Sequence, residues 1–160
     1  MKISWIEVGK LAAGEMPFFA EDVRALHAEG IRAILTLTED AITLLPEITP
    51  ALLRELDLWC FHIPIPDGAA PTEEQARHLL AWMERASQEG RPLLVHCMMG
   101  GGRTGTALHL YYLERGLNLA QARARVAARR PVCVTQLTPP QRAFLDRWQR
   151  DIDDFQLRNR

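Results

Sequence analysis

The segment from Leu93 to Thr106 constrains the fold of this 160-residue chain more than any other part of the sequence. It opens with the apolar run Leu93–Val95, passes through three consecutive glycines, and continues into an apolar stretch with helical character. A short apolar run that ends at glycines is typical of a buried strand. The segment therefore predicts a strand, a tight loop and the start of a helix.

The loop in this segment has the composition of an anion-binding site. Glycines allow backbone conformations that side chains forbid, so successive N–H groups can turn inward around a tetrahedral anion. The amides at the start of the following helix, with its positive dipole end, point to the same place. The residues expected to bind the anion are Met98, Met99, Gly100, Gly101, Gly102 and Arg103.

Three side chains give this loop its chemistry. Arg103 carries a planar fork that can hold two phosphate oxygens, which a lysine cannot match. Cys97 stands at the exit of the strand, where inward amides favour a thiolate; comparable sites lower a cysteine pKa from about 8.5 to about 3.5–7.5. Thr104 follows Arg103, and its hydroxyl can cap the helix, hydrogen-bond the Cys97 sulfur, or do both. The sequence thus predicts a nucleophile and an anion receptor in one loop.

The pattern His96-Cys97, five residues, then Arg103-Thr104-Gly105 resembles the signature of the cysteine-dependent protein tyrosine phosphatases. The chain is most similar to their small, single-domain, atypical dual-specificity branch, from Ser4 to the region of Leu145. The resemblance implies hydrolysis of phosphotyrosine, with phosphoserine and phosphothreonine as further substrates, through a cysteinyl-phosphate intermediate and without metal or cofactor. The expected partner is a phosphorylated protein or peptide.

A second stretch supplies a candidate general acid. The apolar run that starts at Leu58 ends in Pro64, Pro66 and Asp67-Gly68, which is typical of a loop after a parallel strand. A carboxylic acid in a neighbouring loop can protonate the leaving oxygen of a phosphate ester. From spacing alone, Asp67 fits this role and a plain turn equally well; the resemblance favours the acid. His62 lies inside the predicted strand and is expected to be a packed or edge residue.

The alternation of predicted strands and helices defines the fold class. Strands are expected around 5–8, 10–13, 31–37, 58–63 and 93–96. Helices are expected over 21–29, from the Thr49 cap and Pro50 to 58, and over 72–89, 103–113, 119–130 and from 141 onward. This order predicts an α/β protein with a twisted, mainly parallel sheet and helices on both faces. We assign residues 1–150 to one phosphatase domain and 151–160 to a frayed, charged tail. The active site is expected at the carboxyl ends of the strands.

Four further groups have open roles in the sequence. Gln141 is the preferred candidate for placing the hydrolytic water, as the resemblance implies, and Gln136 is its alternative. Glu39 and Asp40 are read as a solvated turn, although they can also select substrate or hold the loop. The arginine-rich helix that ends at Arg130 is read as a solvated basic face. Cys133 is read as an ordinary buried thiol, although a disulfide with Cys97 is conceivable.

Charge and composition narrow the function further. The formal net charge of −1 gives no general attraction to nucleic acid or to anionic membranes. No apolar run reaches membrane-spanning length, and the N-terminus lacks the apolar region of a signal peptide. Three scattered cysteines argue against a disulfide framework. We therefore expect a cytoplasmic monomer that binds neither nucleic acid nor membrane.

Two alternative functions remain at this stage. A phosphate-binding module without turnover would use the same loop, but binding alone requires neither Cys97 nor Asp67. A phosphatase of non-protein esters, such as inositol phosphates, would be expected to carry basic residues at positions 98–102, where this chain has none.

Overall fold

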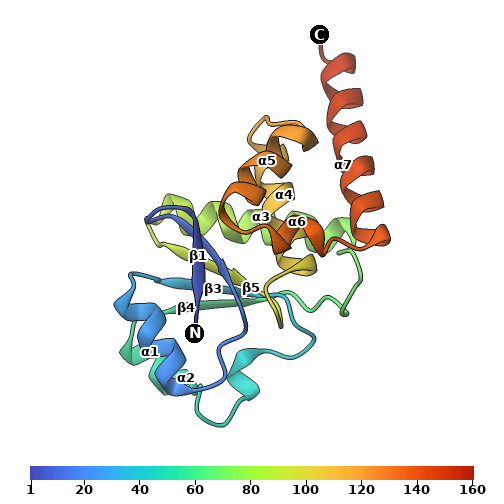
Figure 1. The fold of residues 1–160 in the computed structure, drawn as a ribbon. Helices are drawn as coiled ribbons and strands as arrows, with labels where there is room; N and C mark the ends of the chain where they lie inside the picture. Colours follow the sequence, from blue (N-terminus) through green and yellow to red (C-terminus); the bar gives the residue numbers. More distant parts are fainter.

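The computed structural model describes residues 1–160 and contains one five-stranded sheet with the order β1-β2-β5-β3-β4 (Figure 1). β1 pairs with β2 in antiparallel fashion, and the other three pairings are parallel. The strands are β1 (Ile3–Glu7), β2 (Leu11–Gly14), β3 (Ala33–Thr36), β4 (Trp59–His62) and β5 (Leu93–His96). The mainly parallel sheet predicted from the sequence is therefore confirmed.

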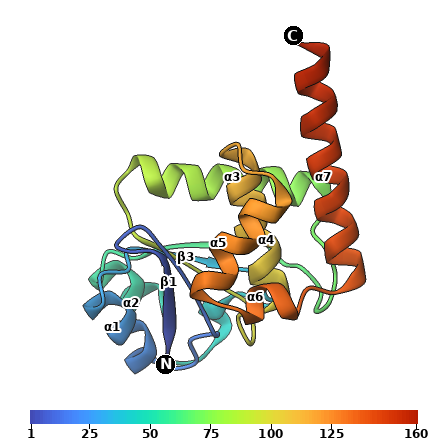
Figure 2. The same ribbon diagram turned by 45° about the horizontal axis from the view of Figure 1, so that its top comes forward.

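Helices cover both faces of this sheet (Figures 1 and 2). One face carries α1 (Ala20–Ala28) and α2 (Pro50–Glu55). The other carries the larger layer, formed by α3 (Glu73–Gln88), α4 (Gly102–Glu114), α5 (Leu119–Arg129), α6 (Val132–Thr135) and α7 (Pro139–Arg158). No helix of this structure combines the length and apolar character that crossing a membrane requires.

The register of the sheet brings four strand ends level with one another. Gly14 of β2 pairs with His96 of β5, and His96 pairs with Thr36 of β3, which in turn pairs with His62 of β4. Because the strands are parallel, their carboxyl ends meet at one edge of the sheet, where ligands bind in open α/β folds. The loops that follow these four strands therefore converge there.

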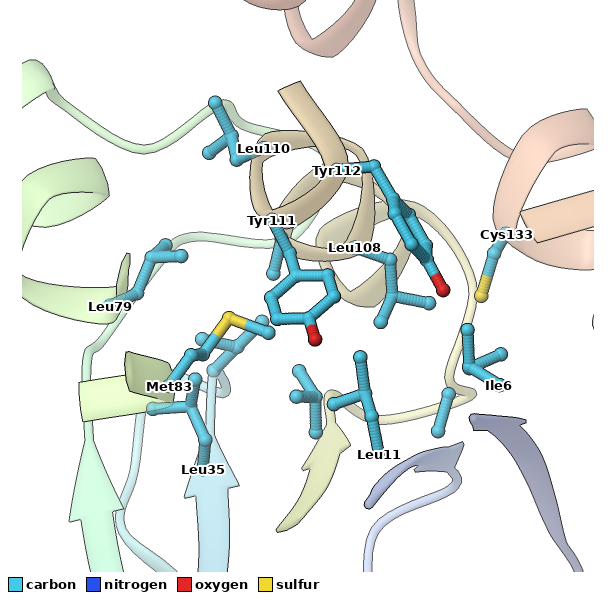
Figure 3. Packing of buried hydrophobic residues seen from close by; sticks show 14 of the residues in the cluster. Ile6, Leu11, Leu35, Leu79, Met83, Leu108, Leu110, Tyr111, Tyr112 and Cys133 are labelled. Atoms are coloured by element: carbon cyan, nitrogen blue, oxygen red, sulfur yellow. The ribbon is translucent and has the colours of Figure 1, made fainter. Parts of the chain in front are cut away.

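The hydrophobic core is divided by the sheet into two clusters. The larger cluster packs α3, α4, α5 and α7 against the sheet, and Figure 3 shows Leu79, Met83, Leu108 and Tyr112 within it. α4 lies at its centre, since its residues from Arg103 to Leu113 are all buried. This burial fixes the helix that begins at the glycine-rich loop.

Three expectations about segments outside the central site are corrected. The helix expected behind the Thr49 cap and Pro50 begins there as α2, but it ends at Glu55 and not at Leu58. The 3-10 turn η1 (Ile42–Leu44) precedes it. The loop expected after residue 131 contains the short helix α6. The residues beyond 150, expected to be frayed, continue α7 as a solvent-exposed helix to Arg158.

Candidate active site

Cys97 lies directly after β5, at the edge of the sheet where the carboxyl ends of the parallel strands meet, and is 4% exposed. His96 fixes this end of the strand, because its Nδ1 lies 2.9 Å from the carbonyl oxygen of Cys97 and its Nε2 lies 2.8 Å from Thr36 Oγ1. Burial lowers the pKa of His96 to about 4, so the ring is neutral at neutral pH. Nδ1 then donates to the carbonyl and Nε2 accepts from the Thr36 hydroxyl. The ring ties β5 to β3 beside the nucleophile.

The surroundings of the Cys97 sulfur favour its thiolate. Burial alone would raise the pKa of this thiol, but hydrogen bonds from the Thr104 side chain, the Thr104 and Gly101 backbone, and the charge of Arg103 together lower it. Thr104 Oγ1 lies 3.2 Å from Cys97 Sγ, which is the contact that the sequence suggested. A thiolate is the reactive form of cysteine, so the geometry suits a nucleophile.

At two glycines of the segment a side chain would collide with backbone atoms. Gly100 has a φ of +69°, and a Cβ there would meet the carbonyl oxygen of Gly14 and the Arg130 guanidinium. A Cβ on Gly105 would collide with the backbone of Cys133. The first glycine allows the loop to close tightly beside β2, and the second allows α4 to pack against α6.

Arg103 lies in the first turn of α4 with its side chain only 3% exposed. Its Nη1 donates to the carbonyl oxygen of Ile65 at 2.8 Å and to Glu39 Oε1 at 2.5 Å, while its Nη2 lies 3.6 Å from Asp67 Oδ1. The guanidinium is thereby fixed where it borders the same cleft as Cys97. The predicted nucleophile, arginine and acid thus come together.

The loop that carries Asp67 is attached to its surroundings on both sides. Gln75 of α3 donates to the carbonyl oxygen of Pro64 at 2.7 Å, and Thr138 Oγ1 donates to that of Gly68 at 2.8 Å. The Asp67 side chain itself is 87% exposed. A backbone held in place and a carboxyl group that faces solvent suit a residue that transfers protons to a substrate entering from solvent.

Glu39 is exposed in the turn after β3, as the sequence favoured, but it also makes the contacts expected of its alternative role in holding a loop. Besides its contact with Arg103, its Oε2 accepts the backbone N–H of Asp67 at 3.4 Å, and the hydrogen bond from Arg103 lowers the pKa of Glu39. Glu39 therefore links Arg103 to the loop that carries Asp67, which we call the acid loop. The neighbouring Asp40 is exposed and makes no such contact.

The two candidate glutamines differ in what their amides bind. Gln141 is fully buried; its Oε1 accepts the N–H of Thr138 and its Nε2 donates to the carbonyl oxygen of Ala69. Gln136 is exposed, lies against Gly101, and its side chain makes no hydrogen bond within the protein. Both border the cleft, but the amide that is free to bind a water belongs to Gln136. The preference for Gln141 is therefore not favoured by the geometry.

These elements enclose a cleft of about 260 Å³. Its wall is formed by the acid loop, the glycine-rich loop and the segment before α7, and includes Asp67, Cys97, Met98, Met99, Gly101, Gly102, Arg103, Gln136 and Gln141. Arg103 is the only cationic side chain in this lining. Met98 and Met99 are 43% and 66% exposed, so the rim beside the nucleophile is apolar. The cleft can hold one phosphate group and offers no second cation.

Several other residues lie outside this cleft. His62 is exposed on the edge strand β4, which is one of the two placements expected for it, and His109 is fully buried in α4. Cys133 is a free, buried thiol, and burial raises its pKa to about 12. Arg123, Arg125 and Arg129 are exposed, but Arg130 turns inward to the glycine-rich loop, which the charge pattern did not indicate.

In this cleft, backbone N–H groups point toward a buried cysteine, and an arginine and a carboxylic acid lie beside it. This arrangement on an α/β fold defines the class of cysteine-dependent phosphatases. The chain belongs to the family described as PTP-SAK, the Swiss Army Knife protein, DSP-PTPase phosphatase domain, whose model matches residues 1–150.

Individual relatives agree with this family. The structure of Tk-PTP in its active form is 29% identical with a TM-score of 0.77, and the match covers 92% of this chain and 96% of that one. The structure of PTPMT1 has a TM-score of 0.81 at 18% identity, over 98% and 99% of the two chains, and shows the fold. Phosphatidylglycerophosphate phosphatase PTPMT2 of Arabidopsis thaliana is 28% identical over 91% of this chain, which spans 63% of that protein's length.

Proposed function

We propose that this phosphatase hydrolyses phosphotyrosine in proteins, and phosphoserine and phosphothreonine as further substrates, through a cysteinyl-phosphate intermediate. The observation that carries the proposal is the Cys97 sulfur under the hydrogen bonds of Thr104 and Gly101, in a cleft that has Arg103 as its single cation. The first step forms a bond between sulfur and phosphorus and breaks the bond between phosphorus and the ester oxygen. Asp67 gives that oxygen a proton.

The second step reverses these roles. Water attacks phosphorus, Asp67 takes a proton from the water, and the thiolate leaves while the Thr104 hydroxyl stabilises it. Arg103 and the loop amides hold the phosphoryl oxygens throughout. The side chain we assign to positioning the water is Gln136, because its amide has no other partner. The free thiols that this chemistry needs favour the reducing cytoplasm as its location.

The rim of the cleft supports an aromatic phosphate ester as substrate. Met98 and Met99 present thioethers at the mouth, and sulfur makes favourable contacts with aromatic rings. A phosphoglycerol group would instead place polar hydroxyls against these side chains. The lack of a second cation further disfavours substrates with two phosphate monoesters.

Replacing Asp67 by asparagine is expected to lower kcat about 10²-fold for an aryl phosphate with a poor leaving group, and much less for one with a good leaving group. The physical reason is that asparagine cannot donate the proton that a poor leaving group needs. Steady-state rates with a series of substituted aryl phosphates measure this dependence on the leaving group.

Asp40→Asn is the matched control, because Asp40 lies on the same edge and does not contact Arg103. It should keep the wild-type dependence on leaving group. Equal rate losses for all leaving groups in Asp67→Asn would contradict the assignment of Asp67 as the acid.

The substrate class is tested by comparing kcat/KM for a phosphotyrosine peptide, a phosphoserine peptide and phosphatidylglycerophosphate in mixed micelles. We expect the highest value for phosphotyrosine, and a loss of about tenfold for this peptide in Met99→Ser, because the thioether contact with the ring is removed. Leu44→Ser is the control, since Leu44 is an equally exposed apolar residue outside the cleft.

The second candidate function is hydrolysis of a phospholipid headgroup monoester. It is favoured by the relative from Arabidopsis thaliana, which is as similar to this chain as Tk-PTP is. A kcat/KM for phosphatidylglycerophosphate at least about tenfold above that for phosphotyrosine would establish this function and overturn the protein substrate.

A further inference from the structure

Three successive carbonyl groups of the glycine-rich loop are bound by groups that do not line the cleft. The oxygen of Met98 accepts the backbone N–H of Met16 at 3.1 Å. The oxygen of Met99 accepts Arg130 Nη2 at 3.3 Å, and the oxygen of Gly100 accepts Arg130 Nε at 2.9 Å. The loop is therefore hydrogen-bonded on the side that faces away from the cleft, and Arg130 donates the hydrogen bonds at two of the three carbonyl groups.

These hydrogen bonds on the outer side of the loop determine where its backbone N–H groups point. In a planar trans peptide, the carbonyl of one residue and the N–H of the next point in opposite directions. Carbonyls directed outward at Met98, Met99 and Gly100 therefore direct the N–H groups of Met99, Gly100 and Gly101 inward. The hydrogen bond from the Gly101 N–H to the Cys97 sulfur agrees with this orientation.

Arg130 is itself fixed in place by two other parts of the chain. Its Nη1 donates to Ser4 Oγ on β1 at 3.0 Å, and its backbone is anchored at the end of α5 by a hydrogen bond to Val126. Its Nη2 lies so close to Gly100 that a side chain at that position would overlap it. A planar guanidinium with donors on three nitrogens suits this task, whereas a lysine carries all its donors on one nitrogen.

We propose that Arg130 is a positioning residue that holds the phosphate-binding amides of the loop in their inward orientation and thereby sets both phosphate affinity and the reactivity of Cys97. This inference rests on the proposed function. Arg130 lies on the side of the loop opposite the cleft, so it contacts neither the substrate nor the Cys97 sulfur.

The test compares Arg130→Ala and Arg130→Lys with Arg129→Ala, an exposed neighbour on the same helix. The first readout is the inhibition constant of inorganic phosphate against aryl phosphate hydrolysis. The second is the pH midpoint for alkylation of Cys97 by iodoacetamide, located by peptide mapping. Burial raises the pKa of Cys60 and of Cys133 to about 12, so alkylation at low pH reports Cys97.

We expect Arg130→Ala to raise the inhibition constant of phosphate about tenfold and to move the alkylation midpoint to higher pH, since two charge-assisted hydrogen bonds are lost. Arg130→Lys should show a smaller change in the same direction, and Arg129→Ala should match the wild type. A merely structural role would lower thermal stability without moving either value.

Folded Arg130 variants with wild-type inhibition constant and midpoint would overturn the inference while leaving the proposed function intact. If Arg130→Ala does not fold, Arg130→Lys and Ser4→Ala decide, because both retain part of the network and should weaken phosphate binding. A wild-type protein that phosphate does not inhibit and whose Cys97 is not alkylated below neutral pH would overturn the proposed function, and this inference with it.

Discussion

Replacing Cys97 by serine is expected to lower kcat for an aryl phosphate at least about 10⁴-fold, because a serine hydroxyl cannot become the anionic nucleophile that this loop stabilises. The hydrogen bonds from Thr104 and Gly101 lower the pKa of Cys97 against the opposing effect of burial. The lowered pKa keeps the thiolate available at lower pH than for an ordinary cysteine. On the acidic side of the pH profile, wild-type activity should therefore fall as the pH drops through the lowered pKa of Cys97.

Binding separates this prediction from misfolding. Cys97→Ser retains the loop amides and Arg103, so a phosphotyrosine peptide should bind it with an affinity similar to the KM of the wild type. A Cys97→Ser variant that keeps about a tenth of wild-type turnover would show that another group attacks phosphorus.

Replacing Arg103 by lysine is expected to reduce kcat/KM about 10³-fold, or about 4 kcal/mol of transition-state stabilisation. Lysine retains the charge but loses the planar fork that meets two phosphoryl oxygens. It also loses the contacts with Ile65 and Glu39 that fix the guanidinium beside the cleft. The effect should appear in kcat as well as in KM, because the equatorial oxygens are held most strongly in the transition state.

Arg129→Lys controls for the general effect of an arginine-to-lysine change, since Arg129 is exposed and contacts no part of the cleft. Steady-state kinetics and circular dichroism on both variants provide the measurement. If Arg103→Lys lowers kcat/KM tenfold or less, a positive charge without the planar guanidinium is sufficient for catalysis, and this account of Arg103 is wrong.

The loop and its neighbours show what the sequence could predict. Cys97, Arg103 and Thr104 lie within one strand, loop and helix, so spacing and glycine content were enough to place them together. Asp67 could be placed because it follows a parallel strand, and the structure shows that the ends of β4 and β5 are level through β3. Local pattern and sheet topology were sufficient to place these residues together, but the family resemblance was needed to favour the acid role of Asp67 over a plain turn.

The remaining contacts depend on tertiary packing that no local pattern records. Glu39 reaches Arg103 across a separation of 64 residues, and Arg130 reaches Gly100 across 30. In the sequence, the former resembles a polar turn and the latter a basic surface helix. Gln141 illustrates the same difficulty, because only the packing of α7 against the acid loop shows that its amide is already occupied.

The central claim is that phosphate passes through Cys97, and acid quenching during turnover tests it most directly. Wild-type protein is mixed with a phosphotyrosine peptide or an aryl phosphate, quenched in acid within the first turnovers, digested and analysed by mass spectrometry. We expect one phosphoryl group on the peptide that contains Cys97, and none in the Cys97→Ser variant treated in the same way. Rapid turnover with no phosphoryl group on Cys97 at any quench time, or with the group on another residue, would contradict the mechanism.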